Sequence, residues 1–310
     1  MKIGAGYDEK MTHFGFLNIN KPAGVTSRWV VDQVQRLVRP DKVGHAGTLD
    51  PLATGVLVVA VGPATRLIEY VQRSTKRYRG KFLLGRSSDT EDTDGRVIEL
   101  ENPPIPSLEQ LQTAAQAMVG EIQQRPPAYS AIKVEGQRSY DLARAGNAVE
   151  LPPRPIRVHR LKIVEYEYPE LVLDVICGGG TYVRTLGRDL AENCGTSAVM
   201  SELTRNAVGE FHRKSAIEVA DLDRNSVGEL MISPLAALTE LPRLTIDAEE
   251  VQRLSHGLPI KSRQEVSSGE AVTVDANGGL VAIVIATEQG LRPNRSFIRG
   301  EKIIQSPGPQ

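Results

Sequence analysis

Asp50 is the side chain whose type and surroundings best suit chemistry. It lies within residues 44–55, which read Gly-His-Ala-Gly-Thr-Leu-Asp-Pro-Leu-Ala-Thr-Gly. Pro51 disfavours a helical conformation at the residue before it, so Asp50 should lie in a turn. The apolar run at residues 56–61 is typical of a buried strand. A carboxylate at the mouth of a core strand is well placed for catalysis, although a turn in which Asp50 bonds its own backbone would also explain the pattern.

Residues 44–55 resemble the catalytic motif of the TruB-type tRNA pseudouridine-55 synthases, in the bacterial form with a C-terminal PUA-like domain. The resemblance implies that Asp50 is the essential catalytic residue. It also implies the reaction, in which uridine-55 of the T-arm (TΨC loop) of tRNA is flipped out and isomerised to pseudouridine, with no cofactor and no metal. Further matches follow in the expected order along most of the chain.

The segment Lys-Pro-Ala-Gly-Val-Thr-Ser at residues 21–27 resembles the family's first motif. Taken alone, it predicts a turn followed by a helix that Ser27 caps. The resemblance adds four residues that support the catalytic motif: Lys21, Pro22, Gly47 and Thr48.

The resemblance also names five residues expected to contact the target uridine or shape its surroundings: His45, Tyr78, Tyr182, Arg184 and Leu203. Tyr78 lies within Lys-Arg-Tyr and would stack on the extruded base, an interaction of about 1–3 kcal/mol. A tyrosine of the core or of the sheet surface is the alternative. His45 would shape the surface over which the RNA base flips, or would simply be a loop histidine bonded to backbone.

Gly-Thr-Tyr-Val-Arg-Thr at residues 180–185 resembles the motif whose arginine pairs with the catalytic aspartate and whose tyrosine lines the pocket. An aspartate with an ordinary pKa of about 3.9 is ionised at neutral pH, and we expect Arg184 to lower the pKa of Asp50 further. Leu203 would pack against the base. The match around Leu203 departs at Thr204 and Asn206, where the family has arginine and threonine, which puts in doubt the RNA contact of that arginine.

The net charge of −1 gives no hint of a nucleic-acid partner, but the charges are segregated. Basic residues gather at 66–86 and 125–162, whereas acidic residues gather at 89–101 and 218–250. This segregation fits a positive groove that follows RNA phosphates, and it fits a solvated surface equally well.

No metal site is expected. The acidic stretch at residues 90–101 resembles a calcium loop only loosely, because Thr90 takes the place of the first aspartate and strands, not helices, flank it. The two cysteines, Cys177 and Cys194, are expected to be reduced and structural. Neither a membrane span of about 20 apolar residues nor an apolar signal core is present, so we expect a cytoplasmic protein, and a monomer.

The predicted fold is α+β (mixed α/β): a pseudouridine-synthase fold around a central twisted, largely antiparallel sheet, followed by a small β-rich PUA-like domain. The resemblance implies a catalytic domain at residues 13–242, with a thumb insertion at about 124–153 that closes over the RNA stem-loop. It also implies an RNA-binding PUA-like domain at 243–304, in which Asn277-Gly278 predicts a hairpin. Tails at 1–12 and 305–310 are expected to be flexible, and Met11 is an alternative start.

Three other interpretations stay open at this point. A synthase of the same family could act on another RNA. A binding-only RNA chaperone would keep the fold without needing the chemistry. A different carboxylate enzyme, such as a glycoside hydrolase, would need a second convergent acid, and none stands out in the sequence.

Overall fold

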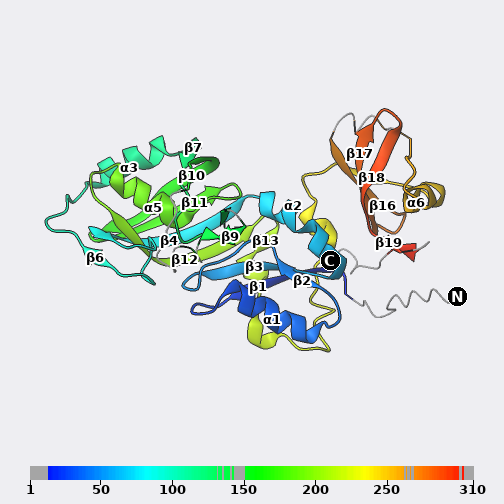
Figure 1. Ribbon diagram of the computed structural model, residues 1–310, viewed down its shortest axis with the longest axis horizontal. Helices are drawn as coiled ribbons and strands as arrows, with labels where there is room; N and C mark the ends of the chain where they lie inside the picture. Colours follow the sequence, from blue (N-terminus) through cyan, green and yellow to red (C-terminus); the bar gives the residue numbers. More distant parts are fainter. Residues whose placement is uncertain are drawn as a thin grey trace.

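The computed structural model describes residues 13–130, 132–134, 136–139, 142, 151–261, 263, 266, 269–299 and 302–303. Both predicted tails and, within the predicted thumb, residues 131, 135, 140–141 and 143–150 lie outside the described residues. The described chain forms one large sheet with helices against it and a smaller second sheet, drawn in orange at the upper right of Figure 1.

The large sheet has the strand order β14-β1-β3-β12-β4-β11-β10-β7, with β2 added to β3 and β13 added to β12. Only the pairs β1–β14 and β3–β12 of this sheet are parallel, so the predicted largely antiparallel sheet is confirmed. The strands are β1 Gly15–Lys21, β2 Val43–His45, β3 Thr54–Val61, β4 Lys76–Leu84, β7 Gly120–Gln124, β10 Arg154–Glu167, β11 Glu170–Cys177, β12 Ala198–Val208, β13 Phe211–His212 and β14 Ile217–Glu218.

The helices of this part are α1 Ser27–Leu37, α2 Ile68–Arg73, α3 Leu108–Ala117 and α5 Val183–Glu192, with 3-10 turns η1 Gly62–Leu67, η2 Arg213–Ser215, η3 Val219–Asp221 and η4 Pro234–Ala237. The segment between β3 and β4 thus forms η1 followed by the short α2, not one continuous helix. A capping box between Ser107 and Gln110 begins α3. Ser27, however, does not cap α1: Thr26 accepts the bond from Trp29, and Ser27 is the first helical residue.

The core of the large sheet lies on both sides of β3 and β4. Val56 to Val61 of β3 are all buried, as the apolar run predicted. On β4, Phe82 lies against α5, where Gly187 leaves room for its ring; a Cβ at Gly187 would come within 2.0 Å of that ring. This close approach brings the first turn of α5, and with it Arg184, down onto the sheet.

The second sheet consists of β15 Arg243–Thr245, β16 Glu270–Val274, β17 Leu280–Thr287 and β18 Gly290–Ser296, and α6 Ala248–Ser255 lies beside it. The predicted Asn277-Gly278 turn joins β16 to β17, and Gly278 has the left-handed φ of +79° that such turns require. Short strand pairs elsewhere are β5 Arg86–Ser87 with β6 Ile98–Glu99, β8 Lys133–Val134 with β9 Gln137–Arg138, and β19 Ile298–Arg299 with β20 Lys302–Ile303.

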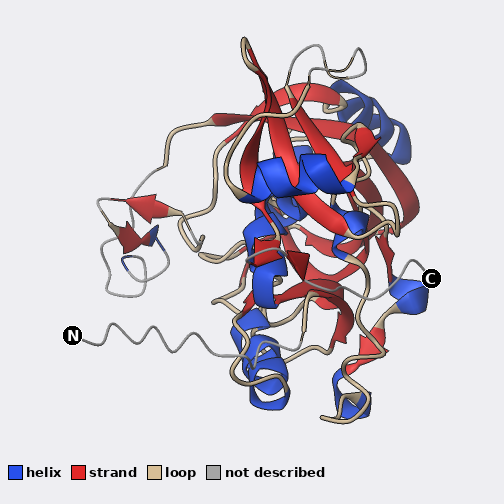
Figure 2. Cartoon of the chain, turned by 90° about the vertical axis from the view of Figure 1, so that its right-hand side faces the viewer, coloured by secondary structure: helices blue, strands red, loops and turns tan. Residues whose placement is uncertain are grey.

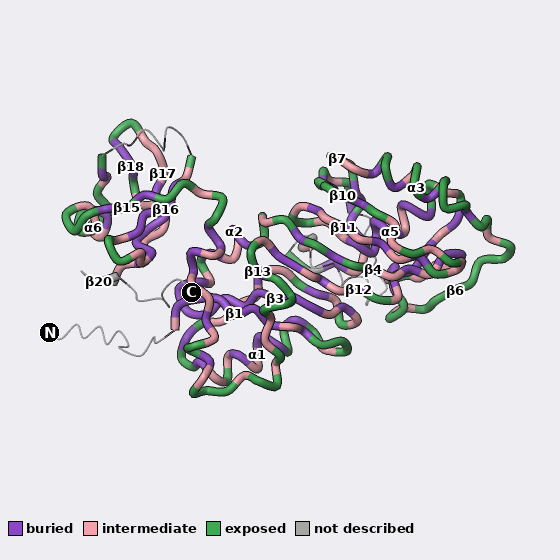
Figure 3. The backbone as a smooth tube through the Cα atoms, turned by 180° about the vertical axis from the view of Figure 1, so that it is seen from behind, coloured by how far each residue is buried: buried purple, intermediate pink, exposed green. Residues whose placement is uncertain are grey.

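The two sheets share a packed contact. Phe14, which precedes β1, stacks on Phe297 with ring centroids 5.3 Å apart, and the hydroxyl of Tyr70 in α2 donates to Glu270 of β16. Figure 2 shows the two parts from the side, and Figure 3 shows that buried segments run along the strands of both sheets. Among the described residues, no helix is long and apolar enough to cross a membrane.

Candidate active site

Asp50 lies in the loop that joins β2 to β3, and its side chain faces the first turn of α5. The carboxylate pairs with the guanidinium of Arg184, with Oδ2 3.1 Å from Nε. The side chain of Arg184 is 6% exposed, whereas that of Asp50 is 33% exposed. A carboxylate that is oriented by a buried cation and still reaches solvent can engage a substrate. The pair expected from the sequence is thus present in the structure.

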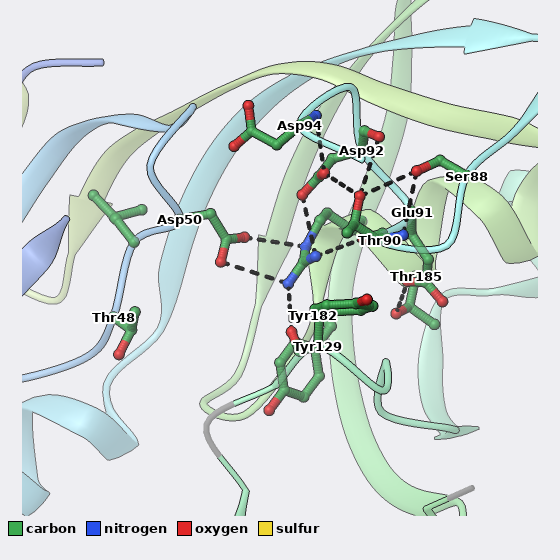
Figure 4. A network of polar contacts seen from close by, with 12 residues as sticks. Thr48, Asp50, Ser88, Thr90, Glu91, Asp92, Asp94, Tyr129, Tyr182 and Thr185 are labelled. Atoms are coloured by element: carbon green, nitrogen blue, oxygen red, sulfur yellow. Dashed lines mark hydrogen bonds and ion pairs between the residues drawn. The ribbon is translucent and has the colours of Figure 1, made fainter. Parts of the chain in front are cut away.

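Arg184 serves a second carboxylate as well. Its Nη1 lies 3.1 Å from Oδ2 of Asp92 and donates to the carbonyl of Thr90 at 2.6 Å. Its Nη2 donates to the carbonyl of Tyr129, at 3.0 Å, in the first part of the predicted thumb. Figure 4 shows Asp50 and Asp92 on opposite sides of this network, with Tyr129 and Tyr182 below it. One buried guanidinium therefore fixes the Asp50 loop, the acidic loop and the start of the predicted thumb together.

The acidic loop is built to hold arginine. Oδ1 of Asp92 accepts bonds from the Thr90 hydroxyl at 2.5 Å and from the backbone of Asp94 at 3.2 Å, so only Oδ2 faces Arg184. The carboxylate of Glu91 accepts from Thr185 at 2.6 Å and pairs with Arg188, both on α5. Within the described part of the chain, no group of three or more acidic, histidine or cysteine side chains is arranged to hold a metal ion.

The loop around Asp50 has a partner for every backbone carbonyl from residue 47 to residue 51. The carbonyls of Gly47 and Thr48 accept from Arg205 of β12, at 3.0 and 3.4 Å. That of Leu49 accepts from Ser27 at 3.0 Å, and that of Asp50 from the backbone of Ala53 at 3.0 Å.

The carbonyl of Pro51 closes the series. It accepts from the backbone of Gly24 at 2.8 Å and from the ammonium of Lys21 at 3.2 Å. Lys21 also donates to the carbonyls of Pro22 and Val25, at 2.8 and 2.7 Å. A loop with so many fixed carbonyls holds the Asp50 carboxylate in place before any substrate arrives.

Arg205 is a positioning residue that sequence reasoning missed. It is buried, and its Nε donates at 2.7 Å to the carbonyl of Val56, the residue after Gly55. Gly55 has a φ of +97°, and a Cβ there would lie 2.3 Å from the carbonyl of Arg205, so only glycine lets β3 and β12 approach this closely. The available signal was that Arg205, next to Thr204, matches the second arginine of the family's motif.

The pKa of Asp50 departs from the expected direction. Partial burial raises it above its ordinary value of 3.8; Arg184 opposes this, and Asp92 and Asp94 add to it. Arg184 lowers the pKa of Asp50 as expected, but the desolvation of the loop and the neighbouring acids outweigh it, so the net shift is upward.

Tyr78 lies on β4 and Leu203 lies on β12, and these two strands pair with each other. Both are buried and belong to the same hydrophobic cluster as Leu49 and Ala53, which flank the Asp50 turn. The Tyr78 hydroxyl is hydrogen-bonded to Arg205, and burial raises its pKa. The structure thus places both residues in the core, next to the Asp50 loop.

Tyr182 precedes α5 and is held through its backbone. Gln124 at the end of β7 receives a bond from the Tyr182 nitrogen at 2.8 Å and donates to its oxygen at 3.0 Å. The guanidinium of Arg154 lies over the Tyr182 ring, 5.4 Å from its centroid. His45 ends β2 opposite Val59 of β3 and is half-buried, on the strand that leads into the Asp50 loop.

The comparisons with known proteins agree on one family. The model of the TruB family pseudouridylate synthase N-terminal domain matches residues 35–183. A protein named tRNA pseudouridine synthase B from Caldanaerobacter subterraneus is 37% identical over 91% of this chain and 99% of its own length. One of the same name from Heliobacterium mobile is 40% identical over 94% of this chain and 95% of its own length.

Solved structures are similar in fold at lower identity. A chain from the crystal structure of a Cbf5-Nop10-Gar1 complex has a TM-score of 0.70 at 24% identity, covering 92% of this chain and 84% of its own. A chain from an H/ACA RNP bound to a substrate RNA containing 2′-deoxyuridine has a TM-score of 0.69 at 22% identity, covering 96% and 93%. At these identities the likeness concerns the fold, and it includes the second sheet.

Proposed function

Since this chain belongs to the TruB family of pseudouridylate synthases and is an isomerase of that family, we propose that it converts uridine-55 in the T-arm of tRNA to pseudouridine, with Asp50 as the catalytic group. The relatives named tRNA pseudouridine synthase B support tRNA as the substrate. The observation that carries the assignment of Asp50 is its partly exposed carboxylate, paired with buried Arg184 in a loop whose carbonyls are all bonded.

The reaction breaks the bond between uracil N1 and the ribose and forms one from uracil C5 to the same ribose carbon. The proton on C5 is released, and N1 takes one up, so the isomerisation balances without oxidant or metal. Asp50 supplies the ionised carboxylate that the reaction needs, and Arg184 keeps this carboxylate oriented and favours its charged form. The uridine must leave its stack to reach Asp50, at a cost of a few kcal/mol, which contacts elsewhere on the RNA must offset.

The surroundings of Asp50 suit these steps. Tyr78 and Leu203 would line the apolar side of the base, and Tyr182 and His45 would border its entrance. Lys21, Pro22, Gly47 and Thr48 hold the loop itself. In this division, residues 13–242 form the catalytic domain, residues 243–304 contact RNA away from the reacting base, and the thumb closes over the stem-loop.

The direct test is to incubate the protein with an unmodified tRNA transcript, without added metal cofactor, and to map pseudouridine at single-nucleotide resolution. The proposal predicts one new pseudouridine, at position 55, and the same product in an isolated T-arm stem-loop. Modification at another position, or of another RNA only, would contradict the proposed substrate. RNA binding without any modification would support the chaperone interpretation.

A further inference from the structure

A groove lies beside the candidate active site, between the end of α2 and the loop that precedes α5. Its volume is about 470 Å³, and it is lined mainly by Glu69, Gln72, Arg73, Arg154, Gly179 and Gly180. The groove does not contain Asp50, so it is separate from the catalytic centre.

Arg154 connects the groove with the active site. Its guanidinium donates to the carbonyl of Gly180 at 2.7 Å and lies over the ring of Tyr182, two residues before Arg184. A strand that leaves the active site past Tyr182 would therefore meet Arg154 next. Tyr182 and the guanidinium plane offer a stacking surface, and the guanidinium offers donors for a phosphate.

Two glycines give the groove its shape. A Cβ at Gly179 would lie 2.4 Å from the carbonyl of Gln72, so the loop rests directly on the end of α2. Gly180 has a φ of +81°, and a Cβ there would lie 3.3 Å from the Arg154 guanidinium. Only a chain without side chains at these positions can bring the Arg154 guanidinium and α2 to the two sides of one groove.

The charge of the groove favours an anion. The side chain of Arg73 is 67% exposed, with its guanidinium 5.5 Å from the centroid of the Tyr70 ring, and Arg154 lines the same groove. Glu69 is the one carboxylate of the lining, and it is already paired with Arg295 of the second sheet and, at 3.5 Å, with Arg73. Two guanidinium groups against one neutralised carboxylate suit a phosphodiester better than an acidic or apolar protein surface.

We propose that this groove binds the sugar-phosphate backbone of the substrate RNA strand that adjoins the flipped uridine, with Arg73 and Arg154 on its phosphates. The proposal rests on the proposed function for the identity of the RNA, and it assigns to these two arginines a part of the binding energy that offsets base flipping. Arg295 of the second sheet pairs with Glu69 of the lining, so that sheet adjoins the groove.

The test uses Arg73→Gln and Arg154→Gln in the full chain, with Arg28→Gln as the control. Arg28 is matched to Arg73, because it is an exposed helical arginine paired with the acid on the neighbouring turn, Asp32. Dissociation constants for an RNA stem-loop are measured over a range of salt concentrations. Each groove variant should weaken binding by about threefold to tenfold and reduce the slope of log Kd against log salt by about 0.7–0.9, whereas the control changes neither.

A second measurement locates the contact. Single phosphates of the stem-loop are replaced by uncharged methylphosphonates, one at a time. At one or two positions, neutralisation should weaken binding by the wild-type protein but not by the groove variants. Unchanged slopes in both groove variants, or an equal loss in Arg28→Gln, would overturn the proposal. These assays measure binding alone, so a wild-type protein that fails to isomerise uridine would refute the proposed function and leave this result standing.

Discussion

The hydroxyl of Ser27 lies 2.8 Å from the backbone nitrogen of Leu49 and 3.0 Å from its backbone oxygen. A single buried side chain thus satisfies both polar groups of the residue that precedes Asp50. Ser27→Ala leaves both without a partner, at about 1–3 kcal/mol each. We expect the rate of isomerisation at saturating RNA to fall about tenfold or more, with the Kd for RNA within about twofold, in single-turnover and binding assays.

Thr26 provides the matched control, since it carries the neighbouring hydroxyl and caps α1. Thr26→Ala should lower the free energy of unfolding by about 1 kcal/mol and leave the rate unchanged. If both alanine variants lowered the rate equally, the effect would belong to α1 as a whole and not to the bond between Ser27 and Leu49.

Arg184→Lys tests the shared guanidinium. A lysine has one charged nitrogen and cannot contact Asp50, Asp92 and the carbonyl of Thr90 in the same geometry. We expect the isomerisation rate to fall about a hundredfold, or about 2.7 kcal/mol in activation free energy.

Arg188 lies one turn further along α5 and pairs with Glu91, not with Asp50. Arg188→Lys should therefore reduce the rate far less than Arg184→Lys does, while the thermal stability of both variants is compared. A rate loss of equal size in the two variants would show that α5 needs its charges only for folding.

The pH dependence of the reaction follows from the raised pKa of Asp50. The carboxylate form is the active one, so kcat/KM should fall as the pH falls through the folded-state pKa, which lies above the ordinary 3.8. Asp94 is a like charge that raises this pKa, and its side chain is exposed. Asp94→Asn should therefore move the acidic limb of the profile to lower pH. A limb that stays in place or moves to higher pH would contradict this view of the site.

Local patterns predicted the elements well. The apolar run predicted β3, and Asn277-Gly278 predicted the hairpin of the second sheet. Each signal lies within a few residues and depends on backbone preferences or periodicity. The pairing of Arg184 with Asp50 and the family itself came from the resemblance, not from these patterns.

Contacts between segments that lie far apart in the chain could not be predicted from the sequence. Arg205 reaches the loop at Gly47 from 158 positions away, and Asp92 meets Arg184 from 92 positions away. Neither leaves a periodic or spacing signal, because such contacts depend on the register of neighbouring strands. The cap of α1 was predicted one residue too late for a related reason. Ser27 and Thr26 both suit a cap, but the Ser27 hydroxyl bonds the backbone of Leu49, so Thr26 caps the helix.

The central claim is tested most directly with Asp50→Asn, which keeps the size of the side chain and the turn but removes the charge. Tritium release from RNA labelled at uracil C5 reports the isomerisation, and filter binding at fixed salt reports the affinity. We expect the rate to fall by many orders of magnitude while the Kd stays within about tenfold, or about 1.4 kcal/mol. Near-normal tritium release by this variant would show that Asp50 is a turn residue and not the catalytic group.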